Sequence, residues 1–187
     1  MVGIAVVAHP LIEMLYGARW LEAAPMLSVL ALGASLWPVH VLNLAAISAQ
    51  GRSDLYLRLE IIKQAVCIAL VLAFARWGPL AIAWSVLLAG LFSAVLNTYY
   101  SWRLLGYGCF AQLADQWPTI ALSGVAAMLG WAVMHWNKAG PVTMIIAVMV
   151  SAAAYLLLAN ITKSEALRDL RSVIYTLRAK QPRNKYE

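Results

Sequence analysis

The sequence predicts an all-α fold, a polytopic transmembrane helix bundle with about five full spans, and composition is the first reason. Apolar residues make up 63% of the chain and charged residues 12%, whereas a soluble domain has about 45–50% and about 25%. The second reason is that runs of about 20 apolar residues, long enough for a helix to cross a hydrocarbon layer of ~30 Å, fill most of the chain before Asn160. Seven of the fourteen Lys and Arg residues follow Asn160. A water-soluble core of this size would need charge along the whole chain.

Five apolar runs bounded by charged residues, Pro or Gly are predicted to span the membrane. They cover residues 24–49, 57–77, 79–102, 118–136 and 141–160. Pro79, Pro118 and Pro141 open the last three runs, and Pro suits a first helical turn because its missing N–H would be unpaired there anyway. Pro38 lies inside the first run and is expected to kink it by removing a backbone hydrogen bond.

The residues before the first span are predicted to form two short helical pieces. Residues 2–8 are apolar but too short to span the membrane, and no Lys or Arg precedes Arg19, which argues against a signal peptide. We interpret them as the end of a truncated N-terminal helix, which suggests a fragment. Residues 10–20 are expected to form a short interfacial helix, with Tyr16 and Trp20 at headgroup depth.

A basic cytoplasmic tail is predicted over residues 161–187. Thr162 and Glu165 match a capping box, in which each side chain accepts a hydrogen bond from the backbone N–H of the other residue. Apolar residues recur at helical spacing over residues 167–177. A C-terminal amphipathic helix is therefore expected over residues 164–179, with its arginines against anionic lipid.

The positive charges predict how the chain is oriented in the membrane. If the turn after the first span is cytoplasmic, eleven Lys and Arg residues fall on that side and three on the other. The three are Arg19, Arg76 and Lys138. Because basic residues accumulate in cytoplasmic loops, this bias predicts a cytoplasmic C-terminus. The net charge of +6 then reflects topology and contact with anionic lipid, and we expect no nucleic-acid partner.

No pattern typical of catalysis or metal binding is visible in the sequence. Cys67 and Cys109 fall on different segments and lack the spacing of metal ligands. The sequence also lacks a phosphate loop, a zinc-protease motif, a nucleophile–His–acid set and paired carboxylates in the spans. We therefore predict no enzymatic activity, no cofactor and no metal site.

Polar residues in two of the spans share helix faces, which matters because polar groups are costly in hydrocarbon. His40, Asn43 and Gln50 follow a helical rhythm in the first span, and Asn97 and Tyr100 do so in the third. One interpretation is that these faces line a water-filled substrate cavity, with His40, Asn43, Asn97 and Tyr100 as candidates. The other is that they hydrogen-bond neighbouring helices. The last two spans carry hydroxyls as their main polar groups and are expected to be peripheral and to face lipid.

Five segments carry a family resemblance. Residues 10–20 read PLIEMLYGARW, and residues 38–43 match a Pro-x-His-x-Leu-Asn segment. Residues 50–54 read QGRSD, residues 59–63 read LEIIK, and residues 97–107 end the third span with an Asn and paired Tyr before a basic turn. Together these motifs resemble the bacterial lipopolysaccharide and exopolysaccharide flippases. These form the oligosaccharidyl-lipid and polysaccharide branch of the multidrug, oligosaccharidyl-lipid and polysaccharide exporter superfamily.

The resemblance implies the C-terminal portion of a larger transporter. Such proteins have two six-helix lobes around a central cavity, usually with two added helices. Residues 1–117 would be the end of the second lobe, residues 118–160 two appended peripheral spans and residues 161–187 the tail. The family carries undecaprenyl-diphosphate-linked oligosaccharide across the bacterial inner membrane by alternating access, for lipopolysaccharide and exopolysaccharide biosynthesis. The implied partners are lipid-linked oligosaccharide, membrane lipids and a missing N-terminal half, which would supply most cations because only His40 lies at membrane depth here.

The predicted cytoplasmic turn is a second candidate site. It consists of Gln50, Gly51, Arg52, Ser53 and Asp54. Ser53 or Asp54 is expected to cap the helix of the second span by accepting from its free N–H groups. Arg52 is expected to anchor at the anionic leaflet.

Two other functions stay open. A drug/cation antiporter of the same superfamily would need an acidic residue in mid-span to couple Na⁺ or H⁺, and the sequence shows none there. A non-transporting membrane scaffold or assembly partner would fit if the 187 residues are a complete protein.

Overall fold

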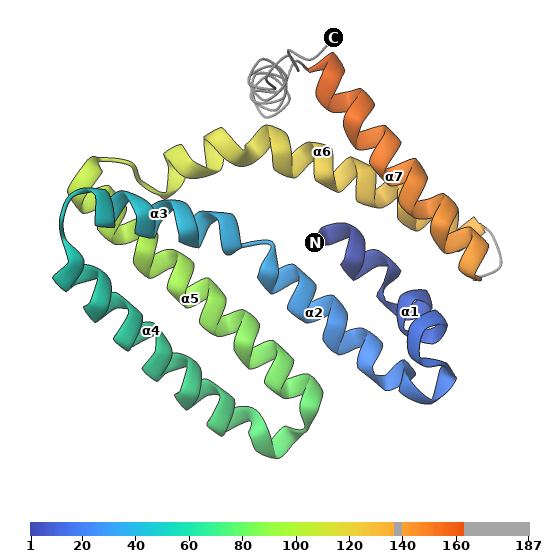
Figure 1. The fold of residues 1–187 in the computed structure, drawn as a ribbon, viewed down its shortest axis with the longest axis horizontal. Coiled ribbons are helices and arrows are strands. Elements are labelled where there is room, and N and C mark those ends of the chain that lie inside the picture. Colours follow the sequence, from blue (N-terminus) through green and yellow to red (C-terminus); the bar gives the residue numbers. More distant parts are fainter. Residues whose placement is uncertain (137–139, 163–187) are drawn as a thin grey trace, which may run out of the picture.

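The computed structural model describes residues 1–136 and 140–162, and these residues form helices joined by short turns (Figure 1). The elements are α1 (Val2–Tyr16), the 3₁₀-helix η1 (Ala18–Ala23), α2 (Ala24–Ala34), α3 (Trp37–Ala49), α4 (Ser53–Phe74), the 3₁₀-helix η2 (Ala75–Trp77), α5 (Pro79–Leu105), α6 (Cys109–Trp136) and α7 (Pro141–Ile161). No strand occurs among the described residues. The predicted all-α fold is confirmed.

Among the described residues, four helical segments are long and apolar enough to cross a membrane. They are Ala18–Ala49, Pro79–Leu105, Cys109–Trp136 and Val142–Ile161. The protein is therefore a multi-pass membrane protein. The second predicted span corresponds to α4, whose 22 residues give about 33 Å of helix at ~1.5 Å per residue. Its first half carries Arg58, Glu60 and Lys63, which sets it apart from the four apolar segments.

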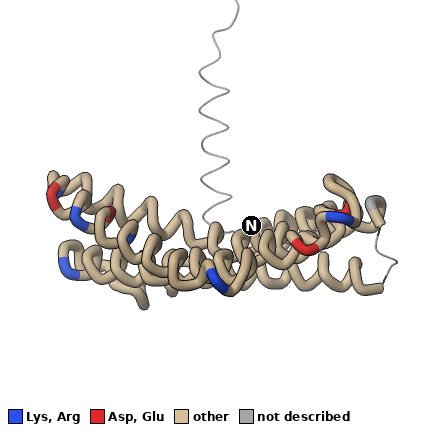
Figure 2. The backbone as a smooth tube through the Cα atoms, turned by 90° about the horizontal axis from the view of Figure 1, so that it is seen from below, with Lys and Arg blue, Asp and Glu red and all other residues tan. Residues whose placement is uncertain are grey.

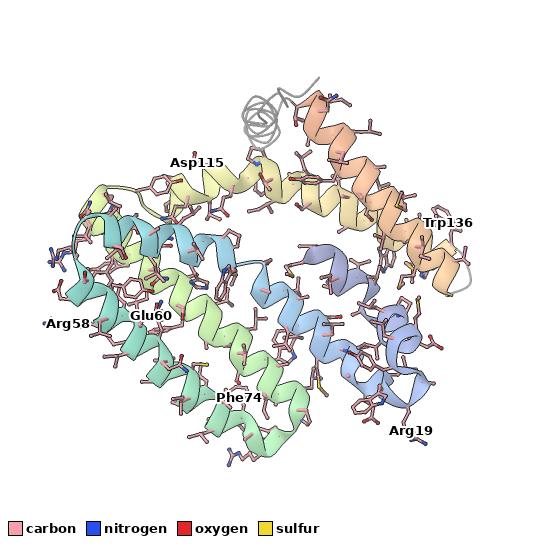
Figure 3. All side chains as sticks on the ribbon, viewed as in Figure 1. Arg19, Arg58, Glu60, Phe74, Asp115 and Trp136 are labelled. Atoms are coloured by element: carbon pink, nitrogen blue, oxygen red, sulfur yellow. The ribbon has the colours of Figure 1, made fainter. Side chains whose placement is uncertain are left out.

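The described helices lie in a flat layer, which Figure 2 shows from its edge. Within the layer α5 contacts α4, α2 and α3, and α6 packs along α7. Most charged residues lie toward the two ends of the layer (Figure 2). Arg58 lies near one end and Arg19 near the other (Figure 3).

The first predicted span is broken into α2 and α3 at Ser35 and Leu36. Pro38 occupies the first turn of α3 and has no N–H to donate back into α2. The N–H of Ser35 bonds to the Ala31 and Leu32 carbonyls at 3.2 and 3.1 Å and so closes the last turn of α2. The predicted kink at Pro38 is confirmed, and it takes the form of a break between two helices.

The N-terminal segment differs from the prediction of two short pieces. A single helix, α1, runs through Pro10 to Tyr16. Gly17 follows it as the C-cap residue, with a φ of 82° in the left-handed region that glycine tolerates. The expected interfacial helix over residues 10–20 is wrong, because its first half continues α1 and its second half belongs to η1. Pro10 is buried, so packing outweighs the backbone bond that it removes.

Two further segments bear on the predicted boundaries. The sequence predicts a loop between the third and fourth spans, but α6 begins at Cys109 and continues through Pro118. Thr162 ends α7, and its hydroxyl donates to the Leu158 carbonyl at 2.9 Å. The predicted amphipathic helix over residues 164–179 lies outside the described residues.

Candidate functional site

A cavity of about 770 Å³ lies between α2, α3, α4 and α5 and is called the α2–α5 cavity below. The small residues Ala89, Gly90 and Ser93 of α5 leave room for it. Apolar residues of α2, α3 and α5 line most of the remaining wall. They include Leu30, Trp37, Val41, Leu44, Val86 and Leu87.

Polar and charged side chains enter the cavity mainly from α4. Glu60, Lys63, Gln64 and Cys67 all line it, and they follow the i, i+3, i+4, i+7 spacing of one helix face. Lys63 is nine-tenths buried, and its ammonium pairs with the Glu60 carboxylate. Figure 3 labels Glu60 on α4. The cavity wall therefore contains an ion pair whose ammonium group is buried, where an unpaired charge would be costly.

The sequence prediction missed the role of Lys63. It counted Lys63 among the cytoplasmic cations and left His40 as the one cation at membrane depth, whereas the structure places Lys63 in the cavity wall. The prediction that no acidic residue lies in mid-span did not consider Glu60, which lies near the start of the second predicted span and lines the same wall. The spacing of Glu60, Lys63, Gln64 and Cys67 on one face was the signal that could have shown this.

His40 also lines the cavity, from α3, and contacts α5 behind it. Its Nδ1 atom lies 3.3 Å from the Nδ2 atom of Asn97. Asn97 is completely buried and does not line the cavity. Its Oδ1 atom and the Ser101 hydroxyl have no hydrogen-bond partner among the described residues. Of these two cavity candidates, His40 lines the wall, and Asn97 contacts the His40 ring from behind the wall.

Asn43 takes part in helix packing. It exchanges two hydrogen bonds with Gln112 of α6, at 3.0 and 2.9 Å, and its amide nitrogen also donates to the Val39 carbonyl at 2.8 Å. Gln112 donates to the Tyr107 carbonyl at 3.1 Å and accepts from the Thr98 hydroxyl at 3.4 Å. The packing interpretation therefore holds for Asn43, and we call these bonds the amide cluster.

Sequence reasoning missed two members of the amide cluster. Gln112 lies in a segment that was predicted to be a loop, and Thr98 lies next to the candidate Asn97. Both side chains are buried. Tyr100, the fourth cavity candidate, does not line the cavity, and its ring packs edge-on against Tyr99 with 5.4 Å between the ring centroids.

The candidate cytoplasmic turn joins α3 to α4 and is exposed. Gln50 is the C-cap residue that follows α3, and Gly51 has a φ of 72°. The predicted side-chain cap is wrong: Ser53 and Asp54 belong to α4, Arg52 precedes it, and no side chain caps the helix. The Arg52 Nε atom instead lies 3.7 Å from the Asp54 Oδ1 atom, an exposed pair of little energetic value.

The turn between α5 and α6 is fixed by an exposed hydrogen bond. The Tyr107 hydroxyl donates to the Asp115 carboxylate at 2.5 Å. This bond raises the pKa of Tyr107, because the carboxylate holds the phenolic proton. The bond ties the turn to the first turns of α6, next to the buried Gln112.

Cys67 and Cys109 are both free thiols, the first half-buried in the cavity wall and the second exposed. No group of His, Cys, Asp and Glu that could hold a metal ion occurs among residues 1–136 and 140–162. Comparison of the chain with protein-family models, with curated proteins and with solved structures gives no match.

Proposed function

We propose that this chain is part of a bacterial inner-membrane transporter that flips a lipid-linked oligosaccharide for surface-polysaccharide biosynthesis. The observation that carries the proposal is the α2–α5 cavity, which combines an apolar wall with a charged one inside a multi-pass bundle. Ionisable residues within membrane helices usually mark a substrate or ion pathway. The resemblance of residues 10–20, 38–43 and 50–54 to flippase motifs supports the same function.

The distribution of polarity in the cavity suits a ligand with a polar and an apolar part. Glu60, Lys63 and Gln64 form a polar wall on α4, whereas Leu30 and Leu87 belong to the apolar wall. A lipid-linked saccharide offers hydroxyl and phosphate groups to the first wall and hydrocarbon to the second. A purely apolar ligand would offer no hydrogen-bonding group to this polar wall, whose charges would then have only each other as partners.

The cavity is proposed to be completed by further helices of the same transporter. The described helices form one layer (Figure 2), and a charged wall that faced lipid directly would be unfavourable. A second set of helices over the cavity would exclude lipid from Lys63 and Glu60. The α6–α7 pair lies away from the cavity wall and is proposed to be peripheral.

Mutations of cavity residues, each compared with a mutation outside the cavity, test the proposal. In the organism that encodes the chain, Lys63→Gln is compared with Arg58→Gln, which removes an exposed cation of the same helix. His40→Ala is compared with Ser123→Ala, a residue of α6 outside the cavity. At matched expression, we expect the two cavity variants to lower surface polysaccharide and to accumulate its lipid-linked precursor. Equal output from cavity and control variants would contradict the proposal.

Glu60 keeps a drug/cation antiporter as a second candidate. Such a transporter needs a carboxylate in its cavity, and Glu60 lines this one. Its pairing with Lys63 argues against free exchange of H⁺ or Na⁺. Loss of cation-driven dye efflux in Glu60→Gln, with normal polysaccharide output, would favour the antiporter. Normal output and efflux in every cavity variant would favour a scaffold.

A further inference from the structure

The two halves of the broken span contact different neighbours besides α5. On α2, the Ser28 hydroxyl donates to the Ala5 carbonyl of α1 at 3.0 Å. A β-carbon on Gly33 would lie 3.5 Å from the Leu87 side chain of α5, so the two helices are in close contact there. α2 is therefore fixed to α1 on one side and to α5 on the other.

α3 packs against α5 and α4, with Ile47 completely buried, and polar contacts hold it in addition. His40 contacts Asn97 of α5, and Asn43 exchanges its two bonds with Gln112 of α6. The backbone between α2 and α3 runs through Ser35 and Leu36, at the break that Pro38 imposes. Helix breaks of this kind are where backbone torsions absorb large movements.

When the amide cluster opens, each amide keeps one local hydrogen bond, and the Asn43 Oδ1 atom loses the bond that it accepts from Gln112. When Asn43 and Gln112 separate, Asn43 keeps its bond to the Val39 carbonyl in its own helix. Gln112 keeps its bond to the Tyr107 carbonyl and its contact with Thr98. Both amides thus retain a local partner, and a buried polar group with a partner is far less costly than one without.

We propose that α3 is a gate that pivots at Ser35 and Leu36, and that the Asn43–Gln112 pair is its latch. α3 supplies His40, Val41 and other residues to the cavity wall, so its movement changes access to the α2–α5 cavity. The gate serves the transport proposed above, but it is defined by the helices alone. It can therefore be tested without any transported ligand.

Native Cys67 reports the opening, because it lines the cavity and is half-buried. The test uses the full chain with Cys109→Ser, which removes the exposed thiol. The rate at which a small maleimide labels Cys67 is measured by mass spectrometry of the peptide that contains this residue. Asn43→Leu and Gln112→Leu each remove one of the two amides that form the latch. Gln50→Leu is the matched control, because Gln50 is an exposed amide at the end of the same helix.

We expect either latch variant to speed Cys67 labelling about three- to tenfold, the factor that corresponds to loss of one modest net polar interaction. The double variant should label no faster than the faster single variant, because both remove the same interaction. Unchanged labelling in both variants, or an equal increase in Gln50→Leu, would overturn the latch.

A cross-link tests the same gate if the leucine variants fail to fold. Asn43→Cys with Gln112→Cys joins α3 to α6 when oxidised, and Cys67 labelling should then slow and recover after reduction. Equal Cys67 labelling in the oxidised and reduced forms would show that α3 does not control access. The transport proposal would survive that result, since it depends on the cavity residues and on polysaccharide output.

Discussion

Gly130 of α6 lies directly against Ser151 of α7. A β-carbon placed on Gly130 would overlap the Ser151 hydroxyl and would lie 3.5 Å from the Ala147 carbonyl oxygen. Small residues let membrane helices approach closely and gain van der Waals contact, which is the main attraction between helices in lipid. A side chain at this position would therefore have to displace the Ser151 hydroxyl, and a large one would push α6 and α7 apart.

Gly130→Leu should destabilise the protein by about 1–3 kcal/mol, the usual cost of overpacking a close contact. Gly124→Leu is the matched control, because Gly124 lies in the same helix and a β-carbon there meets nothing within 4 Å. Thermal unfolding in detergent measures both. Equal melting temperatures for the two variants would show that the Gly130 contact contributes nothing.

Glu60→Gln should destabilise the protein more than the double variant Glu60→Gln with Lys63→Gln. The single change leaves the buried Lys63 ammonium without its carboxylate, whereas the double change removes both charges. We expect about 1–3 kcal/mol for the single change. This is less than for a fully buried pair, because the Glu60 side chain is 41% exposed.

Thermal unfolding of the two variants, with Arg58→Gln as an exposed-cation control, provides the measurement. A double variant less stable than Glu60→Gln alone would mean that the pair itself stabilises the fold. Lys63 would then be better described as a structural group than as part of a polar cavity wall.

Cys109 and a cysteine at Arg19 should react from opposite sides of the membrane. Cys109 is the first residue of α6. The start of α6 lies toward the same end of the layer as the start of α4 (Figure 1), whereas Arg19 lies near the other end (Figure 3). The eleven-to-three charge bias predicts that the Cys109 end is cytoplasmic. An impermeant maleimide added to intact cells should label Arg19→Cys in a background without native cysteines. The same reagent should leave Cys109 of the native chain unlabelled. Labelling of both from outside would reverse or abolish the predicted orientation.

Features that depend on one stretch of chain could be predicted from the sequence. The long apolar runs predicted the membrane helices, and Pro38 predicted the break, because a missing N–H acts within one turn. His40 could be placed at the cavity because its polarity is unusual at that depth. Each inference needed information from a single segment.

Features that depend on pairing between segments could not be predicted. Asn43 and Gln112 are 69 residues apart, and Gln112 lay in an expected loop. The choice between cavity and packing for Asn43 was therefore undetermined until α6 was placed. The place of Lys63 was missed for a different reason. A count of basic residues on each side of the membrane includes a lysine near a helix end, whether or not that lysine also lines a cavity.

The position of α1 has a consequence for biosynthesis. α1 contacts α2 as well as α6 and α7, although α6 and α7 are made last among the described helices. As the chain leaves the ribosome, the side of α1 that later meets α6 and α7 has no protein partner from them and must rest against lipid or insertion factors. Docking of the α6–α7 pair is thus a late assembly step that brings together the first and last described helices, and mutations at that contact should impair maturation more than insertion.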